Sequence, residues 1–293
     1  MKTIIYLLLL PLFASAQPTY KGMVISEKDH KPIPFATVGL VKENIGINAD
    51  ENGYFELNST HPQPNDSLII STIGYVTQKL SLNKLPDTGI QITLTEKAIA
   101  LSPVFISTQK NWTKETLNDY RDCGNSFYTS SGYLRQLAQH FSSPQEGAIL
   151  TRLRICRSTG PLFKPARTIF RIRVYDMDSL TGGPGQDLSP AIIEVKSRNS
   201  SISLNLEDYK IQIPHRDYFI AIEWLKIPYN ERESFTATGP HKGINITYEP
   251  AIGWKEGKHS IPELWEMTYQ DKWHRVSNFL RNKTALISAI IKY

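Results

Sequence analysis

The sequence has few of the residues that build metal or redox sites. Only two cysteines occur among 293 residues, and their spacing does not match a zinc site. None of the seven histidines is followed three residues later by Glu, which a zinc peptidase of the His-x-x-Glu type needs. Phosphate-binding loops, dinucleotide fingerprints and nucleophile elbows are also absent, so local motifs predict a protein that is not an enzyme.

Long apolar runs are equally scarce, and the one clear run lies at the N-terminus. Lys2 is followed by mostly apolar residues from 4 to 13 and then by Ala14-Ser15-Ala16. This pattern predicts a secretory signal peptide over residues 1–16, cleaved before Gln17. An N-terminal anchor that is not cleaved is the alternative. No later stretch approaches 18 apolar residues, so no transmembrane segment is expected in the mature chain.

The charge is only mildly one-sided. The chain carries a net +5, with 7 Lys and Arg against 9 Asp and Glu in residues 17–98 and 25 against 19 in residues 99–293. Nucleic-acid binders usually concentrate their basic residues in a stripe or patch. Since no such stripe is visible in the sequence, nucleic acid is not an expected partner.

The two cysteines, Cys123 and Cys156, could form a disulfide in an exported protein. The loop would span 33 residues and contribute about 3–4 kcal/mol in the chain-entropy model. Two separate buried thiols are the alternative.

The front part of the chain reads as a series of short strands. The expected strands cover residues 20–26, 35–41, 45–49, 54–57, 68–73, 76–82 and 90–94. Asp50-Glu51-Asn52-Gly53 is a turn signal between two of them, so residues 45–49 and 54–57 are predicted to form a hairpin. Seven short strands without an amphipathic helix predict a β-sandwich over residues 17–98.

Four motifs in this part resemble a known family. They are Gly22-x-Val24, Lys31-Pro-Ile-Pro34-Phe-Ala36-Thr-Val38, Asp50-Glu-Asn-Gly53-Tyr-Phe55 and Ile73-Gly74-Tyr75. Over roughly residues 19–97 the chain resembles the carboxypeptidase regulatory-like domain of exported Bacteroidetes-type proteins. The resemblance implies a prealbumin-like (immunoglobulin-like) sandwich that is itself non-catalytic. It also implies a bacterial origin. Together with the predicted signal peptide, this gives an expected location in the periplasm, or at the cell surface or outer membrane.

The remainder divides into a predicted connector and a second domain. Residues 99–145 are polar and mixed, and residues 133–138 fit either a helical turn or an extended segment. Residues 146–293 contain eight or nine strand-like segments separated by turn clusters, which predicts a larger, jelly-roll-like β-sandwich. This half weakly resembles an exported β-sandwich without an assigned activity. The whole chain is therefore expected to be all-β.

A calcium site is one hypothesis for the second domain. Asp176, Asp178 and Asp187 bracket a Gly-rich segment between two expected strands, and carboxylate oxygens are calcium ligands. The spacing does not match an EF-hand loop. The alternative is a long hairpin loop whose Asp and Gly residues serve turn geometry. Calcium is the only cofactor that we consider.

An arginine patch is a second hypothesis. Arg152 and Arg154, like Arg171 and Arg173, are spaced by two, so each pair lies on one face of its strand. If the two strands paired, four guanidiniums would share one patch and could bind an anion or an acidic glycan through bidentate contacts. The alternative is a surface ion-pair ladder in which a strand residue such as Glu194 or Glu223 neutralises the arginines.

An aromatic ligand surface is a third hypothesis. Trp254, Trp265 and Trp273 lie within one short window, and a hairpin turn is expected at Gln270-Asp271. Exposed aromatic faces can stack on sugar rings, but aromatic pairs across strands more often pack in a core.

These observations favour an exported, non-catalytic binding or interaction protein of the bacterial cell envelope. Its partner is unknown; an envelope protein or a glycan would fit. One alternative is an enzyme that acts on envelope glycan or peptide through residues scattered over the second domain. Another is a structural accessory of an outer-membrane uptake or secretion complex.

Overall fold

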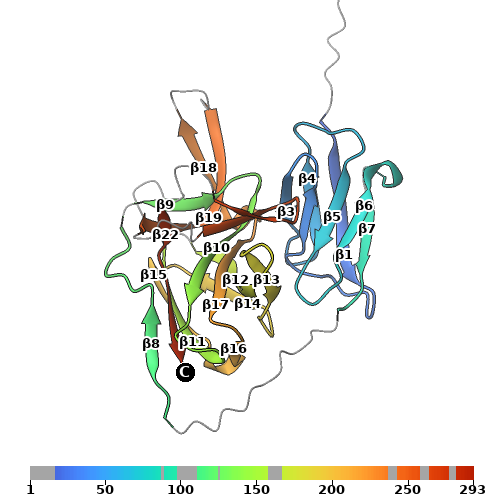
Figure 1. Cartoon of the computed structure of the whole chain (residues 1–293). Coiled ribbons are helices and arrows are strands. Elements are labelled where there is room, and N and C mark those ends of the chain that lie inside the picture. Colours follow the sequence, from blue (N-terminus) through green and yellow to red (C-terminus); the bar gives the residue numbers. More distant parts are fainter. Residues whose placement is uncertain are drawn as a thin grey trace, which may run out of the picture.

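The chain forms two β-sandwiches that lie side by side (Figure 1). The computed structural model describes residues 17–86, 89–97, 111–124, 126–157, 167–236, 243–257, 264–276 and 282–293. The predicted signal peptide and the first part of the predicted connector lie outside these residues. In the described part of the chain, the helical elements are single 3₁₀ turns: η1 (Leu82–Lys84), η2 (Glu207–Tyr209) and η3 (Pro228–Asn230). The all-β prediction is confirmed.

The front sandwich contains the seven predicted strands. They are β1 (Thr19–Ser26), β2 (Thr37–Leu40), β3 (Ile45–Asn48), β4 (Tyr54–Asn58), β5 (Ser67–Ser71), β6 (Gln78–Ser81) and β7 (Ile90–Leu94). One sheet has the order β4-β1-β7 and the other the order β3-β2-β5-β6. Alternation along β4 shows why these residues form a sandwich: Phe55 and Leu57 are buried, whereas Tyr54 and Glu56 face solvent.

The predicted hairpin at residues 50–53 is wrong. β3 pairs with β2 and β4 pairs with β1, so the turn carries the chain from one sheet to the other. The turn chemistry is as expected: the Asp50 carboxylate accepts hydrogen bonds from the backbone amides of Asn52 and Tyr54, and Gly53 has a φ of +74°. Turn residues predict that the chain reverses direction, but they do not determine whether the two flanking strands pair with each other.

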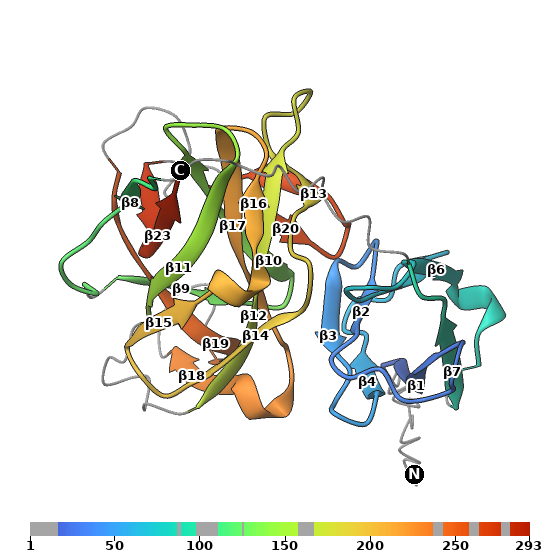
Figure 2. The same ribbon diagram turned by 90° about the horizontal axis from the view of Figure 1, so that it is seen from below.

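The second sandwich consists of antiparallel sheets around one core (Figure 2). Its largest sheet has the order β13-β12-β17-β10-β20-β21, with β14 also paired to β12. These strands are β10 (Leu134–Ser142), β12 (Thr168–Met177), β13 (Pro184–Asp187), β14 (Ile193–Ser197), β17 (Asp217–Trp224), β20 (Leu264–Thr268) and β21 (Trp273–Arg275). A facing sheet has the order β15-β11-β23-β8, with β16 also paired to β11.

The remaining strands complete these layers. The facing sheet is built from β8 (Lys114–Leu117), β11 (Ala148–Cys156), β15 (Ser201–Asn205), β16 (Ile211–Ile213) and β23 (Ile287–Lys292). A third sheet joins β9 (Phe127–Ser130), β18 (Glu231–Thr236), β19 (Gly243–Glu256) and β22 (Lys283–Ala285).

Residues 111–145, which were predicted to be part of a connector, instead form strands of the second sandwich. β8, β9 and β10 lie within residues 99–145, yet each is a strand of the second sandwich. β10 is a central strand, paired with β17 on one side and β20 on the other. Almost all of its residues are buried, because both faces of this sheet are covered. Its apolar and polar residues therefore lack a simple period of two, which is why residues 133–138 gave no clear strand signal.

A seam of hydrogen bonds joins the two sandwiches. The Asn48 backbone amide donates to the Lys226 carbonyl at 3.0 Å, and the Lys226 amide donates to Asn48 Oδ1 at 2.7 Å. The Lys226 ammonium is buried, donates to the carbonyls of Ser131 and Gly132, and lies over the Tyr269 ring. Burial lowers the pKa of Lys226 well below its usual value.

The β2–β3 hairpin fits closely against Tyr269 in the turn between β20 and β21. Figure 2 shows β3 on the side of the front sandwich that faces the second one. A Cβ atom at Gly46 would lie 2.2 Å from Tyr269 Cε1, and one at Gly39 would lie 2.3 Å from Cδ1. The Tyr269 amide donates to Asn44 Oδ1 at 3.0 Å. Glycine at these two positions therefore allows the two domains to approach.

Cys123 and Cys156 are joined by a disulfide. Cys156 is the last residue of β11, and its sulfur lies in a small buried cluster with Tyr120 and Leu286. The bond thus ties the segment between β8 and β9 to the facing sheet. No helix in the described ranges is long and apolar enough to cross a membrane.

We predict that Gly46→Ala weakens the seam. The added methyl group would overlap the ring of Tyr269, which is buried and cannot swing away, so we expect a loss of about 1–3 kcal/mol. Thermal unfolding measures the change. Gly132→Ala is the control, because nothing lies within 4 Å of the position that its added methyl group would take. Equal melting temperatures for both variants would contradict the close fit.

We predict that Cys123→Ala with Cys156→Ala lowers the free energy of unfolding by about 3–4 kcal/mol, because the open chain regains the entropy of a 33-residue loop. Urea unfolding measures it. Reductant should destabilise the native protein by a similar amount and leave the stability of the double variant unchanged. If reductant does not change the stability of the native protein, the disulfide does not stabilise the fold.

Candidate functional site

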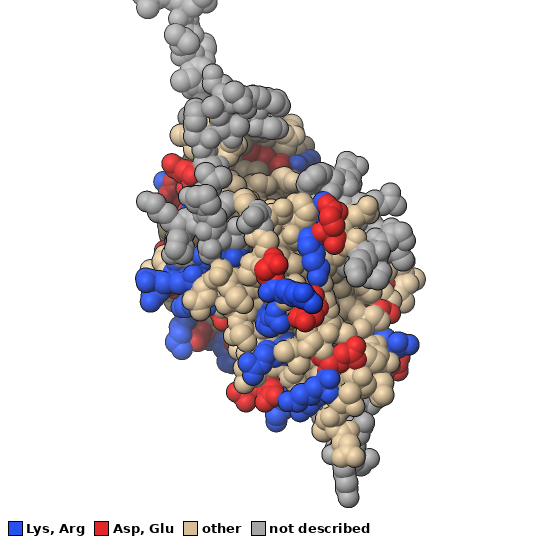
Figure 3. Space-filling model, turned by 90° about the vertical axis from the view of Figure 1, so that its left-hand side faces the viewer, with Lys and Arg blue, Asp and Glu red and all other residues tan. Residues whose placement is uncertain are grey.

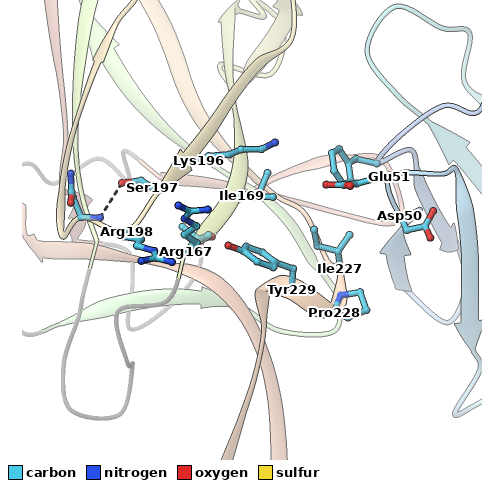
Figure 4. A pocket seen from close by; sticks show the side chains of 13 residues that line it. Asp50, Glu51, Arg167, Ile169, Lys196, Ser197, Arg198, Ile227, Pro228 and Tyr229 are labelled. Atoms are coloured by element: carbon cyan, nitrogen blue, oxygen red, sulfur yellow. Dashed lines mark hydrogen bonds between the residues drawn. The ribbon is translucent and has the colours of Figure 1, made fainter.

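A cleft of about 740 Å³ opens between the two sandwiches (Figure 4). We call it the interdomain cleft. Its lining residues are Phe35, Asp50, Glu51, Arg167, Thr168, Ile169, Lys196, Ser197, Arg198, Asn199, Ile227, Pro228 and Tyr229. This size lies within the range of ordinary small-molecule sites.

The floor of the cleft is apolar. Phe35 from the front sandwich packs with Ile169, Leu225 and Ile227 from the second, and all four side chains are buried. The Asn230 side chain supports this floor by accepting from the Ile169 amide and donating to the Ile169 and Leu225 carbonyls. The floor is therefore fixed by both packing and hydrogen bonds.

The wall contributed by the second sandwich is basic. Arg167 precedes β12, and Lys196 and Arg198 lie at the end of β14. The antiparallel register pairs Ser197 with Thr168, which brings Arg167 and Arg198 to the same end of the two strands. Lys196 forms an ion pair with Glu194 at 3.3 Å. This register concentrates three cations within a few residues of each other.

The facing wall is acidic and comes from the front sandwich. It is formed by Asp50 and Glu51, in the turn between β3 and β4. Figure 4 shows Glu51 directed toward the opening and Lys196 extended toward the wall that carries Glu51. Tyr229 in η3 is 47% exposed, and its ring lies between the floor and the arginines in the same view.

The sequence hypotheses missed this cleft. Residues 50–53 appeared in them only as a turn signal. Arg167 is distant in sequence from Lys196 and Arg198, and the three residues meet through the pairing of β12 with β14. A clustering of exposed basic residues at strand ends could have suggested them, but only once that pairing was known.

The four predicted arginines do not share one patch. β11, which carries Arg152 and Arg154, and β12, which carries Arg171 and Arg173, belong to different sheets. That part of the arginine hypothesis is wrong. Arg154 pairs with Asp119 at 3.0 Å and donates to the Tyr120 carbonyl, and Arg152 donates to Ser203 Oγ.

Arg171 and Arg173 lie in a buried charge network. The Glu223 carboxylate is opposite Arg171 in the β12–β17 register and 3.4 Å from Arg173, which also pairs with Asp187. Arg171 is 2% exposed and reaches the Phe35 and Pro34 carbonyls at 3.4 Å. Arg171 therefore links the sheet to the front sandwich, whereas Arg173 links strands within the sheet.

The pKa of Glu223 reflects this network. Burial alone would raise the pKa, but the attraction of Arg173 and Arg171 outweighs it and lowers the pKa below its usual value. A depressed carboxyl pKa stabilises the fold above the unfolded value of about 4.3, and the contribution is lost as the pH falls through the folded value. The network should therefore weaken in acid.

The predicted tryptophans lie in two places. Trp265 and Trp273 are on paired strands, with Trp265 packed against Ala138, Tyr175 and Phe219. The Arg275 guanidinium lies over the Trp265 ring. Trp254 is on β19, where its ring meets Tyr128 edge-on and Lys283 lies over it. The three rings therefore do not form one surface.

The predicted calcium ligands serve the loop between β12 and β13. Asp176 Oδ1 accepts from the Gln186 amide, and Asp178 Oδ1 accepts from the amides of Leu180 and Thr181. Asp187 binds Arg173. Across the described residues, no group of three or more His, Cys, Asp or Glu side chains could hold a metal ion.

The charge on the outer face of the second sandwich is mixed. Figure 3 views the molecule from the side opposite the front sandwich, and there Lys and Arg side chains alternate with Asp and Glu. This face does not form one continuous basic surface.

The front sandwich is similar to a known protein family. Residues 20–106 match the CarboxypepD_reg-like domain. The predicted resemblance of the front domain to the carboxypeptidase regulatory-like domain is therefore confirmed. Domains of that family are regulatory and non-catalytic. No curated protein matches the chain.

Solved structures match only distantly. A clostridial cysteine protease, Cwp84, is 10% identical with a TM-score of 0.39, and the match covers 88% of this chain and 65% of that one. A DUF3823 family protein from Parabacteroides merdae is 10% identical, with 72% and 100% covered and a TM-score of 0.19. A protein from Bacteroides uniformis, provisionally described as carbohydrate binding, is 10% identical, with 80% and 96% covered and a TM-score of 0.18.

We predict that Glu223→Gln destabilises the protein by about 3–5 kcal/mol, because it removes the buried countercharge that lies beside both Arg171 and Arg173. Glu56→Gln is the control; it removes the exposed partner of Lys21 and should cost at most about 1 kcal/mol. Urea unfolding at pH 7 and pH 3.5 measures both. The stability lost on acidification should be smaller in Glu223→Gln than in the native protein, and an equal loss would exclude Glu223 as a source of acid sensitivity.

Proposed function

We propose that the chain is an exported, non-catalytic binding protein of the bacterial cell envelope and that the interdomain cleft is its ligand site. The proposal rests chiefly on one observation: both sandwiches contribute walls to a single cleft with an apolar floor and a polar rim. Apolar surface supplies affinity in such sites and a few polar groups supply orientation. The signal-peptide pattern of residues 1–16 supports export.

The chemistry of the cleft favours binding over catalysis. Its lining contains neither histidine nor cysteine. The Asp50 carboxylate is held by two backbone amides of its own turn, so it has a structural task. Ser197 Oγ accepts from the Asn199 amide. A nucleophile and a base within hydrogen-bond reach would mark a hydrolase, and these contacts supply none.

The seam makes the cleft a preformed site. The Asn48–Lys226 hydrogen bonds and the packing of Tyr269 fix one sandwich against the other. A ligand then needs to order few groups when it binds, which preserves affinity. The arrangement also gives the non-catalytic front domain a role, since that domain supplies one wall of the cleft.

We predict that Tyr229→Ala removes ligand binding while the fold is kept, because Tyr229 is a half-exposed ring that lines the cleft. The experiment screens residues 17–293 against acidic and neutral envelope oligosaccharides and short peptides by calorimetry. Tyr133→Ala is the matched control, since Tyr133 is 49% exposed and lies outside the cleft. We expect at least a tenfold loss of affinity in Tyr229→Ala and none in Tyr133→Ala.

Two results would contradict the proposal. Equal binding by both tyrosine variants would place the ligand elsewhere. Turnover of an oligosaccharide or peptide that disappears with a single substitution in the cleft would make the protein an enzyme.

A further inference from the structure

Two arginines in the interdomain cleft have no partner in the described part of the protein. Arg167 and Arg198 are exposed, and neither guanidinium makes a hydrogen bond or an ion pair with any residue that the structure describes. The segment 158–166, which leads into Arg167, contains no Asp or Glu. Two like charges at the ends of paired strands repel each other, so this corner of the cleft favours an anion.

Two strand arginines of the second sandwich behave differently. Arg154 and Arg173 both pair with carboxylates. Arg167 and Arg198 line one cavity, and neither pairs with a carboxylate among the described residues. Since guanidinium groups bind carboxylates through two parallel hydrogen bonds, the pair is suited to an acid group on a ligand.

The surface next to the arginines suits a ring. Tyr229 presents a half-exposed aromatic face, and Ile169 and Ile227 continue the apolar surface beneath it. Figure 4 shows the Tyr229 hydroxyl directed toward the two arginines. A sugar ring has an apolar C–H face that packs on an aromatic ring, while its acid group can reach the guanidiniums at the same time.

The opposite wall limits the charge of the ligand. Glu51 has no partner among the described residues and points toward the opening. It would repel a densely charged polyanion and tolerate a ligand with well-separated single charges. This disfavours polyphosphates and nucleic acids, and it is compatible with a sugar chain that carries one carboxylate per residue.

We infer that the ligand of the interdomain cleft is an acidic saccharide, with its carboxylate on Arg167 and Arg198 and its ring on Tyr229. This inference rests on the proposed function and adds the ligand class. Glu51 acts as the specificity-determining residue, because it sets how much negative charge the cleft accepts.

The test measures binding of galacturonate, mannuronate and N-acetylneuraminate oligomers by calorimetry, with maltotetraose as the neutral probe. Arg167→Gln and Arg198→Gln should each weaken binding of the acidic oligomer at least tenfold, since each removes a charge-assisted contact. Arg121→Gln is the control, an exposed arginine outside the cleft. Glu51→Gln should strengthen binding several-fold, because it removes a repulsive charge.

The salt dependence supplies a second readout. Affinity for the acidic oligomer should fall as salt rises, and the fall should be shallower in the Arg167→Gln, Arg198→Gln double variant. Binding of maltotetraose, if it occurs, should not respond to either arginine. Circular dichroism of each variant separates loss of binding from loss of fold.

The outcomes distinguish the two proposals. Saturable binding of maltotetraose or a peptide at the cleft, with no binding of the acidic oligomers, overturns the acidic-saccharide inference and leaves the binding function intact. Tighter binding of tetraglutamate than of the acidic oligomers assigns the cleft to acidic peptides and overturns the inference. Competition by inorganic phosphate at the same molar concentration shows a general anion site and overturns it as well. Failure of every probe to bind overturns both.

Discussion

The structure depends most on how the front sandwich docks on the second one. Asn48 and Lys226 exchange two hydrogen bonds across the seam, and the same asparagine side chain donates to the Phe35 carbonyl. Phe35 in turn forms part of the cleft floor. One buried polar side chain therefore couples the domain contact to the shape of the candidate site. Because a buried amide without partners is costly, the two sandwiches have few alternative ways to fit together.

The docked front domain also explains the charges inside the molecule. Arg171 and Glu223 lie on the outer face of the largest sheet, which in an isolated sandwich would meet water. Here that face is covered, and both side chains are 2% exposed. The cost of burying these charges is offset by their partners. Arg173 pairs with Glu223 and Asp187, and Arg171 donates to the Phe35 carbonyl. These ion pairs are buried at the domain interface. Removing one partner there destabilises a protein far more than removing one partner of a surface ion pair.

The sequence predicted local structure well and spatial neighbours poorly. All seven front strands were found, because alternation and turn residues are local signals. The pairing partner of β3 was not predicted, because a turn signal does not determine which strands pair. β10 was missed because a strand buried on both faces loses its period. Glu223 was named as a countercharge for the arginines, as the structure shows, but Arg167 and Arg198 meet only through the β12–β14 register, a long-range pairing that no single motif encodes.

The cleft separates the residues that shape it from those that would meet a ligand. Its floor is buried and shared with the seam, whereas Glu51, Arg167 and Arg198 are exposed at the ends of strands or in a turn. Substitutions at such exposed positions usually change stability by no more than about 0.5 kcal/mol. The rim is therefore free to diversify while the scaffold stays constant. Proteins built on this plan could acquire new ligand preferences through a few rim positions, in the way that loop variation on a fixed framework generates new specificities elsewhere.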